Sequence, residues 1–180
     1  MAFNVTEFRS NLVGDGARPN LFQVSMTFPT FTTDAVGAAQ TLTFTAKAAQ
    51  LPGSTLGTVP QYYFGRELKF VGNRSFADWT ITIINDENFK VRKAFESWMN
   101  GINSHAGNIR SGAALTPTAY SSDAKVNQYD KAGNIIKAYN FVGAFPVDLS
   151  PIDLDWGSND SIEEFTVTLA YQWWETDSTT

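Results

Sequence analysis

The sequence predicts a mainly β protein in which two packed antiparallel sheets form a β-sandwich or barrel, with one α-helix at about residues 87–102. Several segments alternate apolar and polar residues, which is the period of a half-buried strand. One segment instead spaces its apolar residues three or four apart, as a helix does. The chain has 180 residues, of which 43% are hydrophobic, so it can form a single domain over residues 1–180 with a full core.

The strand pattern recurs along the chain. In residues 20–28, apolar Phe22, Val24 and Met26 alternate with polar residues, so one face of this strand is expected to be buried. Residues 29–40 are expected to form a loop. Further strands are predicted at residues 41–48, 66–72, 79–84 and 165–173, together with a hairpin in residues 125–145 that turns at residues 131–134.

The predicted helix directly follows a strand. Residues 85–87 (Asn-Asp-Glu) supply a short polar side chain that can cap free N–H groups, and carboxylates for the positive end of the helix dipole. Phe89 points away from the apolar stripe and is expected to be exposed. The stripe itself, which is the expected core side of the helix, consists of Val91, Phe95, Trp98 and Ile102.

Composition argues against several classes of function. No cysteine is present, so disulfides, thiolate metal sites and cysteine nucleophiles are excluded. Lysines and arginines do not cluster with aromatic residues, which disfavours nucleic-acid binding. The first residues lack the basic and apolar regions of a secretory signal, and no apolar run reaches the roughly 20 residues that span a bilayer, so we expect no membrane insertion.

The charges are unevenly distributed along the chain. The net charge is -5, and all 13 basic residues lie at or before Lys137, whereas the chain from Tyr139 onward carries only carboxylates. Two interpretations remain open: neighbouring strands of one chain exchange charge, or copies of the chain assemble head to tail. The outward strand faces are rich in Thr, Ser and Gln rather than in the charges that usually protect sheet edges, so the edges are expected to pair with another copy.

We expect no enzymatic activity, no metal and no cofactor. The one histidine, His105, lies in a Gly-rich loop without nearby carboxylates. Asp153 and Asp155 alternate along an expected strand, but a glycosidase usually takes its two carboxylates from elements that face each other across a cleft. Residues 153–160 are similar to a calcium-binding loop, except that Gly157 stands where a third oxygen ligand is needed.

The five tryptophans could form a sugar-binding face only if several of them lie outside the core. Trp79 and Trp98 lie on apolar stripes and are expected in the core, and Trp173 continues the apolar face of the last strand. Trp156 and Trp174 are off the pattern. They keep open the alternative of a monomeric carbohydrate-binding β-sandwich module.

Four stretches resemble the tail tube protein of T-even-like contractile-tailed bacteriophages. They come in the order found in that family and cover most of the chain. The strand-to-helix stretch and the final strand are the most specific. The stretches are ARPNLFQV (17–24), AAQLPGS (48–54), GNRSFADWTITIINDENFKVRKAFESW (72–98) and LDWGSNDSIEEFTVTLAYQWWE (154–175).

The resemblance implies a structural function. Six copies would form a ring, and rings would stack into a hollow tube that conducts DNA into a bacterium. The implied partners are other copies, the tail sheath protein, baseplate and tail terminator proteins, and the tape measure protein and DNA, which lie in the lumen without specific binding. The implied location is the virion tail, assembled in the host bacterial cytoplasm. Related rings serve phage-like injection and secretion particles, which remain the nearer alternative.

The resemblance also implies which residues touch neighbours. An extended hairpin and the N-terminal segment would reach the next ring, and the outer helix would face the sheath. The N-terminal segment and the C-terminal tail (176–180) are expected to be flexible. By position, the inter-ring candidates are Ala17, Arg18, Asn20, Leu51, Pro52, Tyr62, Tyr63 and Phe64, and the sheath-facing candidates are Phe89, Lys90 and Lys93.

Overall fold

A computed structural model describes residues 4–179 of the chain. Residues 1–3 of the predicted N-terminal segment and Thr180 of the predicted tail lie outside the described residues. The helices are α1 (Val5–Asn11), α2 (Ala35–Thr45), α3 (Lys90–Ile102) and α4 (Pro117–Tyr120), with 3-10 turns η1 (Val13–Asp15) and η2 (Gly112–Ala114). The strands are β1 (Phe22–Met26), β2 (Ala46–Ala49), β3 (Thr55–Tyr63), β4 (Arg66–Ser75), β5 (Trp79–Ile84), β6 (Ser122–Tyr129), β7 (Ile135–Leu149), β8 (Glu164–Ala170) and β9 (Trp173–Glu175).

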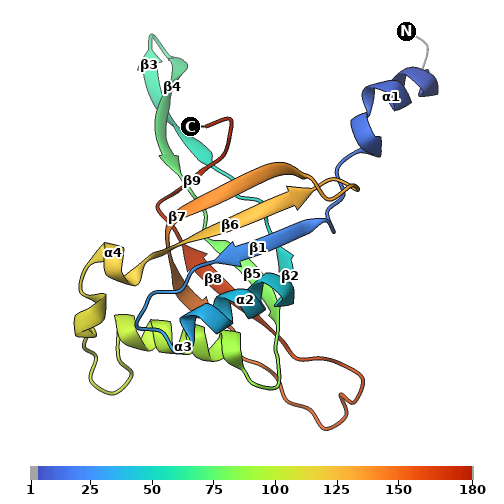
Figure 1. Ribbon diagram of the computed structural model, residues 1–180. Coiled ribbons are helices and arrows are strands. Elements are labelled where there is room, and N and C mark those ends of the chain that lie inside the picture. Colours follow the sequence, from blue (N-terminus) through green and yellow to red (C-terminus); the bar gives the residue numbers. More distant parts are fainter. Residues whose placement is uncertain (1–3, 180) are drawn as a thin grey trace.

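The predicted mainly β architecture is confirmed. One large antiparallel sheet has the order β1-β6-β7-β8-β5-β2, and β3 and β4 form a separate two-stranded sheet (Figure 1). The long strand β7 is shared: its first part pairs with β6 and β9, and its last part, from Phe145 to Leu149, pairs with β8. The large sheet therefore bends at β7 into two layers, with α2 and α3 packed beside them (Figure 1).

The core lies between these layers and the helices. Strand β5 buries Trp79, Ile81 and Ile83 at alternate positions, as its pattern predicts. The ring of Trp79 stacks on Phe141 of β7 at 4.1 Å between centroids, which joins the two layers. Burial of such large apolar side chains is the main source of stability for a fold of this kind.

Helix α3 confirms the predicted apolar stripe. Val91, Phe95 and Trp98 are each at most 2% exposed, and the indole N–H of Trp98 donates to the Tyr120 carbonyl at 2.6 Å. The helix begins at Lys90 rather than at about residue 87. Its first N–H group donates to the carboxylate Oδ1 of Asp86 at 2.9 Å, so the predicted polar start is present four residues before the helix.

The strand predicted at residues 41–48 was wrong: this stretch ends helix α2 and begins β2. Ala38 and Leu42, four residues apart, are fully buried, whereas Phe44 is 85% exposed, so burial follows the helical period. The preceding alanines favour a helix, which shortens the loop predicted at residues 29–40. Together with α1 and α4, this helix also corrects the prediction that the chain has a single helix.

The predicted last strand is broken into two. Strand β8 buries Phe165, Val167 and Leu169 as expected, but it ends at Ala170. The Gln172 N–H then donates to the Val142 carbonyl at 3.0 Å, and the chain continues as β9 beside the first part of β7. Because the chain crosses between layers here, the alternation of one strand does not continue into the next.

This crossing reverses the predicted environments of two neighbouring tryptophans. Trp173, expected on the apolar face, is 45% exposed, and its indole N–H donates to Glu175. Trp174, expected off the pattern, is half-buried and packs edge-on against Tyr139, with ring centroids 5.6 Å apart. Across residues 4–179, none of the helices combines the length and apolar character required to cross a membrane.

Candidate assembly surfaces

The β3–β4 hairpin projects away from the body of the molecule (Figure 1). Every residue of β3 is exposed, and β4 is exposed except at the half-buried Gly72. A two-stranded ribbon is at best marginally stable alone in water, so a hairpin of this length with both faces exposed is expected to pack against a partner. Its apolar surface includes Leu56, Val59, Tyr62, Tyr63, Phe64, Leu68, Phe70 and Val71, each at least 46% exposed.

The hairpin carries the predicted inter-ring candidates Tyr62, Tyr63 and Phe64 at its tip. Tyr63 pairs with Arg66 across a two-residue turn, and the rings of Tyr63 and Phe64 contact edge to face at 4.6 Å. Phe64 is 93% exposed. The candidates Leu51 and Pro52 lie instead in the segment before β3, close to the body, so the structure separates these two groups of candidates.

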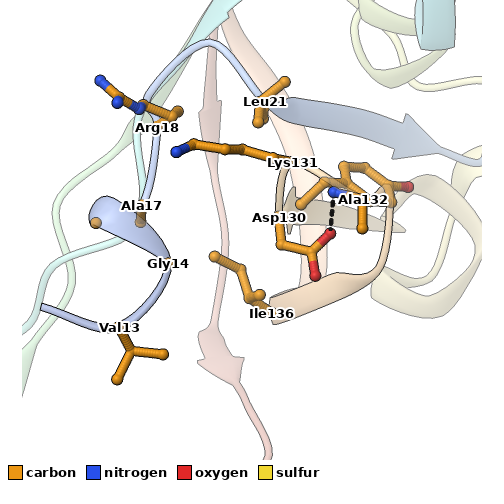
Figure 2. Close-up of a pocket in the computed structure, with 11 residues that line it drawn as sticks. Val13, Gly14, Ala17, Arg18, Leu21, Asp130, Lys131, Ala132 and Ile136 are labelled. Carbon is orange, nitrogen blue, oxygen red and sulfur yellow. Dashed lines mark hydrogen bonds between the residues drawn. The ribbon is translucent and has the colours of Figure 1, made fainter. Parts of the chain in front are cut away.

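A second surface lies where the N-terminal segment meets the β6–β7 turn. A cavity of about 340 Å³ lies between the two segments. The predicted candidates Ala17 and Arg18 lie on one side of it (Figure 2). Apolar side chains supply most of its remaining wall: Val13, Leu21, Ala132 and Ile136. Asn20, the third candidate of this segment, is exposed but does not line the cavity.

Sequence reasoning missed most of this cavity. Its walls come from residues 13–21 and 129–136, which are brought together by the pairing of β1 with β6. One local signal was available: Ile135 and Ile136 are consecutive apolar residues beside a polar turn, and each is about half-exposed. Neighbouring strand positions face opposite sides, so two adjacent isoleucines could not both reach one core.

Charged groups hold the rim of the cavity in place. The Lys131 ammonium lies 3.1 Å from the Asp15 carboxylate and links the two segments. Asp130 accepts N–H bonds of 2.8 Å from both Ala132 and Asn134. The side-chain hydrogen bond from Asn134, followed by these main-chain bonds, lowers the pKa of Asp130 below its usual value of 3.8.

The sheath-facing candidates gather at the start of α3. Phe89 adopts a left-handed conformation with φ 55° and is 37% exposed, so its ring lies off the buried stripe as predicted. Lys90 and Lys93 are exposed, and the Lys93 ammonium donates to the Asn88 carbonyl at 2.9 Å. These three side chains form a small basic and aromatic surface on the outside of the helix.

The acidic C-terminal part is partly neutralised within the chain. Lys47 pairs with Glu164, and Lys137 pairs with Asp177, so two of the C-terminal carboxylates contact basic groups of the body. Asp153 and Asp155, by contrast, lie in an exposed loop rather than the expected strand. Ion pairs within the chain therefore neutralise some of the C-terminal carboxylates. The loop carboxylates are exposed to solvent, where they can also contact another copy.

The described residues do not gather into a metal or sugar site. No group of three or more potential metal ligands occurs among residues 4–179. His105 lies in an exposed loop. Trp156 is fully exposed, whereas the indole N–H of Trp174 is bonded to the Gly53 carbonyl at 3.1 Å and its ring is half-buried, so the two do not form a common stacking platform.

Comparison with known proteins identifies the family. The family model described as phage tail tube protein matches residues 17–177. The chain is 36% identical to tail tube protein gp19 of Enterobacteria phage T4 over 163 residues, which covers 90% of this chain and 93% of the relative. It is 32% identical to the tail tube protein of Serratia phage KSP90 over 171 residues, which covers 93% of each.

Solved structures show the same fold at low sequence identity. The tube-terminating cap structure of the anti-feeding prophage aligns with a TM-score of 0.63 and 16% identity over 89% of this chain and 90% of that one. The sheath–tube complex of the extracellular contractile injection system PVC, in its extended state, aligns with a TM-score of 0.60 and 16% identity over 98% and 99%. The chain therefore belongs to the phage tail tube protein family, whose members are structural components of the virion tail.

Proposed function

We propose that copies of this chain form hexameric rings that stack into the hollow tube of a contractile phage tail. The projecting β3–β4 hairpin is the observation that carries this proposal, because it exposes apolar residues on both faces and makes no extensive contact with another element of the described chain. The tip residues Tyr62, Tyr63 and Phe64 and the N-terminal candidates Ala17, Arg18 and Asn20 are the proposed inter-ring contacts. Leu51 and Pro52, in the segment before β3, are proposed inter-ring contacts as well.

The tube is proposed to conduct DNA without binding it. The net charge of -5 and the Thr-rich outward positions of β5 and β8 suit a channel that does not hold phosphate, since a basic lining would bind the DNA. The tape measure protein occupies the same lumen before DNA does, also without specific binding. No cofactor and no enzymatic step are needed for this function.

Other tail proteins are proposed to bind the outside and the ends of the tube. The surface formed by Phe89, Lys90 and Lys93 faces the tail sheath protein, and carboxylates on the sheath would complement its two ammonium groups. Baseplate and tail terminator proteins bind the first and last rings, whose hairpins and cavities have no neighbouring ring. Assembly takes place in the host bacterial cytoplasm.

A second candidate is the tube of a phage-like injection particle. The relatives named for the anti-feeding prophage and PVC share the fold, which supports a tube but not a particular cargo. The closer sequence identity to the tail tube proteins of phages T4 and KSP90 favours the phage tail. A genome locus or particle that lacks a capsid would favour the injection particle instead.

Negative-stain electron microscopy of the purified chain tests the proposal. We expect six-fold rings or hollow rods at high protein concentration. The matched variant replaces residues 57–73 by a two-residue Asn-Gly turn, which removes most of the hairpin but leaves the core residues in place. Rods from the wild type but not from this variant are expected. Rods of equal number from both would contradict the role given to the hairpin, and a wild type that stays monomeric even with added baseplate would contradict self-assembly.

A further inference from the structure

We propose that the aromatic tip of the hairpin, Tyr63 and Phe64, inserts into the apolar cavity beside the β6–β7 turn of a second copy of this chain. The cavity is the one lined by Val13, Ala17, Leu21, Ala132 and Ile136. The inference rests on the proposed function, because it requires that copies assemble. The inference goes beyond that function because it names the surface that receives the hairpin.

The first observation is the unfavourable residue at the turn. Phe64 and Gly65 form the two-residue connection between β3 and β4, and both have positive φ, 44° and 80°. Turns of this kind favour Asn-Gly or Asp-Gly, because a bulky side chain at positive φ is strained. A phenylalanine here works against the stability of the isolated hairpin. Such local conflicts concentrate at functional positions, where another contact compensates them.

The second observation is that the two aromatic rings at the tip contact each other and are exposed. The rings of Tyr63 and Phe64 contact each other edge to face, with an angle of 77° between their planes, so they present one compact aromatic surface. Phe64 is 93% exposed and Tyr63 is 65% exposed. Rigid aromatic side chains lose little conformational entropy on binding, and they are enriched among residues that contribute most to interfaces.

The third observation is the cavity itself. Its volume of about 340 Å³ is at the lower end of the roughly 300–1,000 Å³ found for pockets that enclose a small molecule, which suits an aromatic pair. Val13 is 90% exposed and Ile136 is 45% exposed on its wall (Figure 2). The described part of the chain leaves Val13 almost uncovered and Ile136 about half covered, so an inserted ring would remove further apolar surface from water.

Charges around the tip and the cavity are complementary. Arg66 and Glu67 directly follow the turn at the hairpin tip. At the cavity, the Asp130 carboxylate can meet the arginine and Arg18 can meet the glutamate, whereas Lys131 is already paired with Asp15. Opposite charges beside an apolar contact fix the orientation of the partners more than they raise affinity.

The hairpin and the cavity of one chain do not meet. In Figure 1 the hairpin projects at the upper left, whereas η1 and the β6–β7 turn lie at the right end of the large sheet. Pairs of elements in extensive contact include β3 with β4, but neither strand with η1, β6 or β7. A tip on one side and a cavity on another produce a heterologous contact, which propagates from copy to copy.

Cysteine cross-linking tests the contact directly, because the chain has no cysteine of its own. Copies carrying Phe64→Cys are mixed with copies carrying Ala132→Cys and assembled into rods well above the wild-type critical concentration, because loss of the phenylalanine itself weakens assembly. The rods are then treated with a short bismaleimide. A covalent dimer is expected for this pair. The control pair combines Phe64→Cys with Thr33→Cys, which is exposed beside α2, and is expected to give no dimer. Rods in which neither pair cross-links would overturn this inference while leaving the proposed tube intact.

A second variant separates assembly from folding. Phe64→Asn places a residue that tolerates positive φ in the turn, so the hairpin should be at least as stable as in the wild type. Its critical concentration for rod formation is nevertheless expected to rise by about tenfold or more, as for the loss of an interface hot spot. Ala132→Leu, which partly fills the cavity, should raise it in the same direction. Rod formation by both variants at the wild-type concentration would overturn the inference, whereas a wild type that forms no rods even with added baseplate would refute the proposed function together with it.

Discussion

The indole N–H of Trp174 donates a hydrogen bond of 3.1 Å to the carbonyl oxygen of Gly53, which ties the C-terminal strand β9 to the segment entering the projecting hairpin. The same indole lies 6.5 Å from the ring of Phe76, which follows the hairpin. Trp174 therefore contacts the chain on both sides of β3–β4. Because neither hairpin strand makes extensive contact with an element of the described chain outside the hairpin, these contacts at its base set its direction relative to the body.

Replacing Trp174 by alanine should loosen the hairpin without unfolding the body. We expect faster amide hydrogen exchange in β3 and β4, while exchange in β5 and α3 stays near the wild-type rate. Trp173→Ala is the matched control, since the indole N–H of that exposed neighbour donates to Glu175 rather than to the segment entering the hairpin. Equal exchange in the hairpins of both variants would refute the role of Trp174 in directing it.

Trp98 should contribute far more to stability than the exposed Trp156. It is fully buried, packs near Phe28 and Phe95, and donates its indole N–H to the Tyr120 carbonyl. Trp98→Ala is expected to lower the free energy of unfolding by about 3–5 kcal/mol, measured by urea titration. Trp156→Ala, at a fully exposed position, should change it by no more than about 0.5 kcal/mol. Similar losses for both would contradict the core described here.

Asp86 should stabilise the start of helix α3. Its Oδ1 accepts the Lys90 N–H at 2.9 Å, so Asp86→Ala leaves that group without its side-chain partner. We expect a loss of about 1 kcal/mol in the free energy of unfolding. Glu87→Ala removes a neighbouring exposed carboxylate and serves as the control for charge at the same helix end. A loss of equal size in the control would assign the effect to charge rather than to capping.

Acid should weaken the β6–β7 turn through Asp130. The hydrogen bonds from Asn134 and Ala132 lower the pKa of this carboxyl below 3.8 in the folded chain. A lowered folded pKa contributes stability above the unfolded pKa, and this contribution is lost as the pH falls through the lower folded value. Asp130→Asn is therefore expected to be less stable than the wild type at about pH 6, with a difference that shrinks at about pH 2.5. Urea midpoints of both proteins at the two pH values measure this difference in stability. A difference that persists in acid would contradict the stabilising role of the ionised Asp130.

Two elements were predictable because their patterns are local. In β5 the burial of Trp79, Ile81 and Ile83 alternates, and in α3 the buried residues recur every three or four positions. Each element places one apolar face against the core, so the spacing of apolar residues within the segment reveals whether it is a strand or a helix. The resemblance to tail tube proteins added the aromatic tip of the hairpin as a predicted contact, which local periodicity does not reveal.

Helix α2 shows where a local pattern misleads. Residues 41–45 alternate threonine with apolar residues, as a strand would, yet Leu42 faces the core and Phe44 faces solvent. The helix packs on β1 and α3, and those contacts bury the side of α2 that carries Ala38 and Leu42. Tertiary packing here outweighs the intrinsic preference of a short segment.

By itself, the sequence determined the mainly β class, the β5–α3 unit with its polar start, the β6–β7 hairpin and the family. Only the tertiary structure decided which of Trp173 and Trp174 is half-buried, and that residues 13–21 meet the β6–β7 turn to form a cavity. The physical reason is distance along the chain. Lys131 and Asp15 are 116 positions apart, and Trp174 and Gly53 are 121 apart, so their contacts depend on how the strands pair rather than on any neighbouring residue.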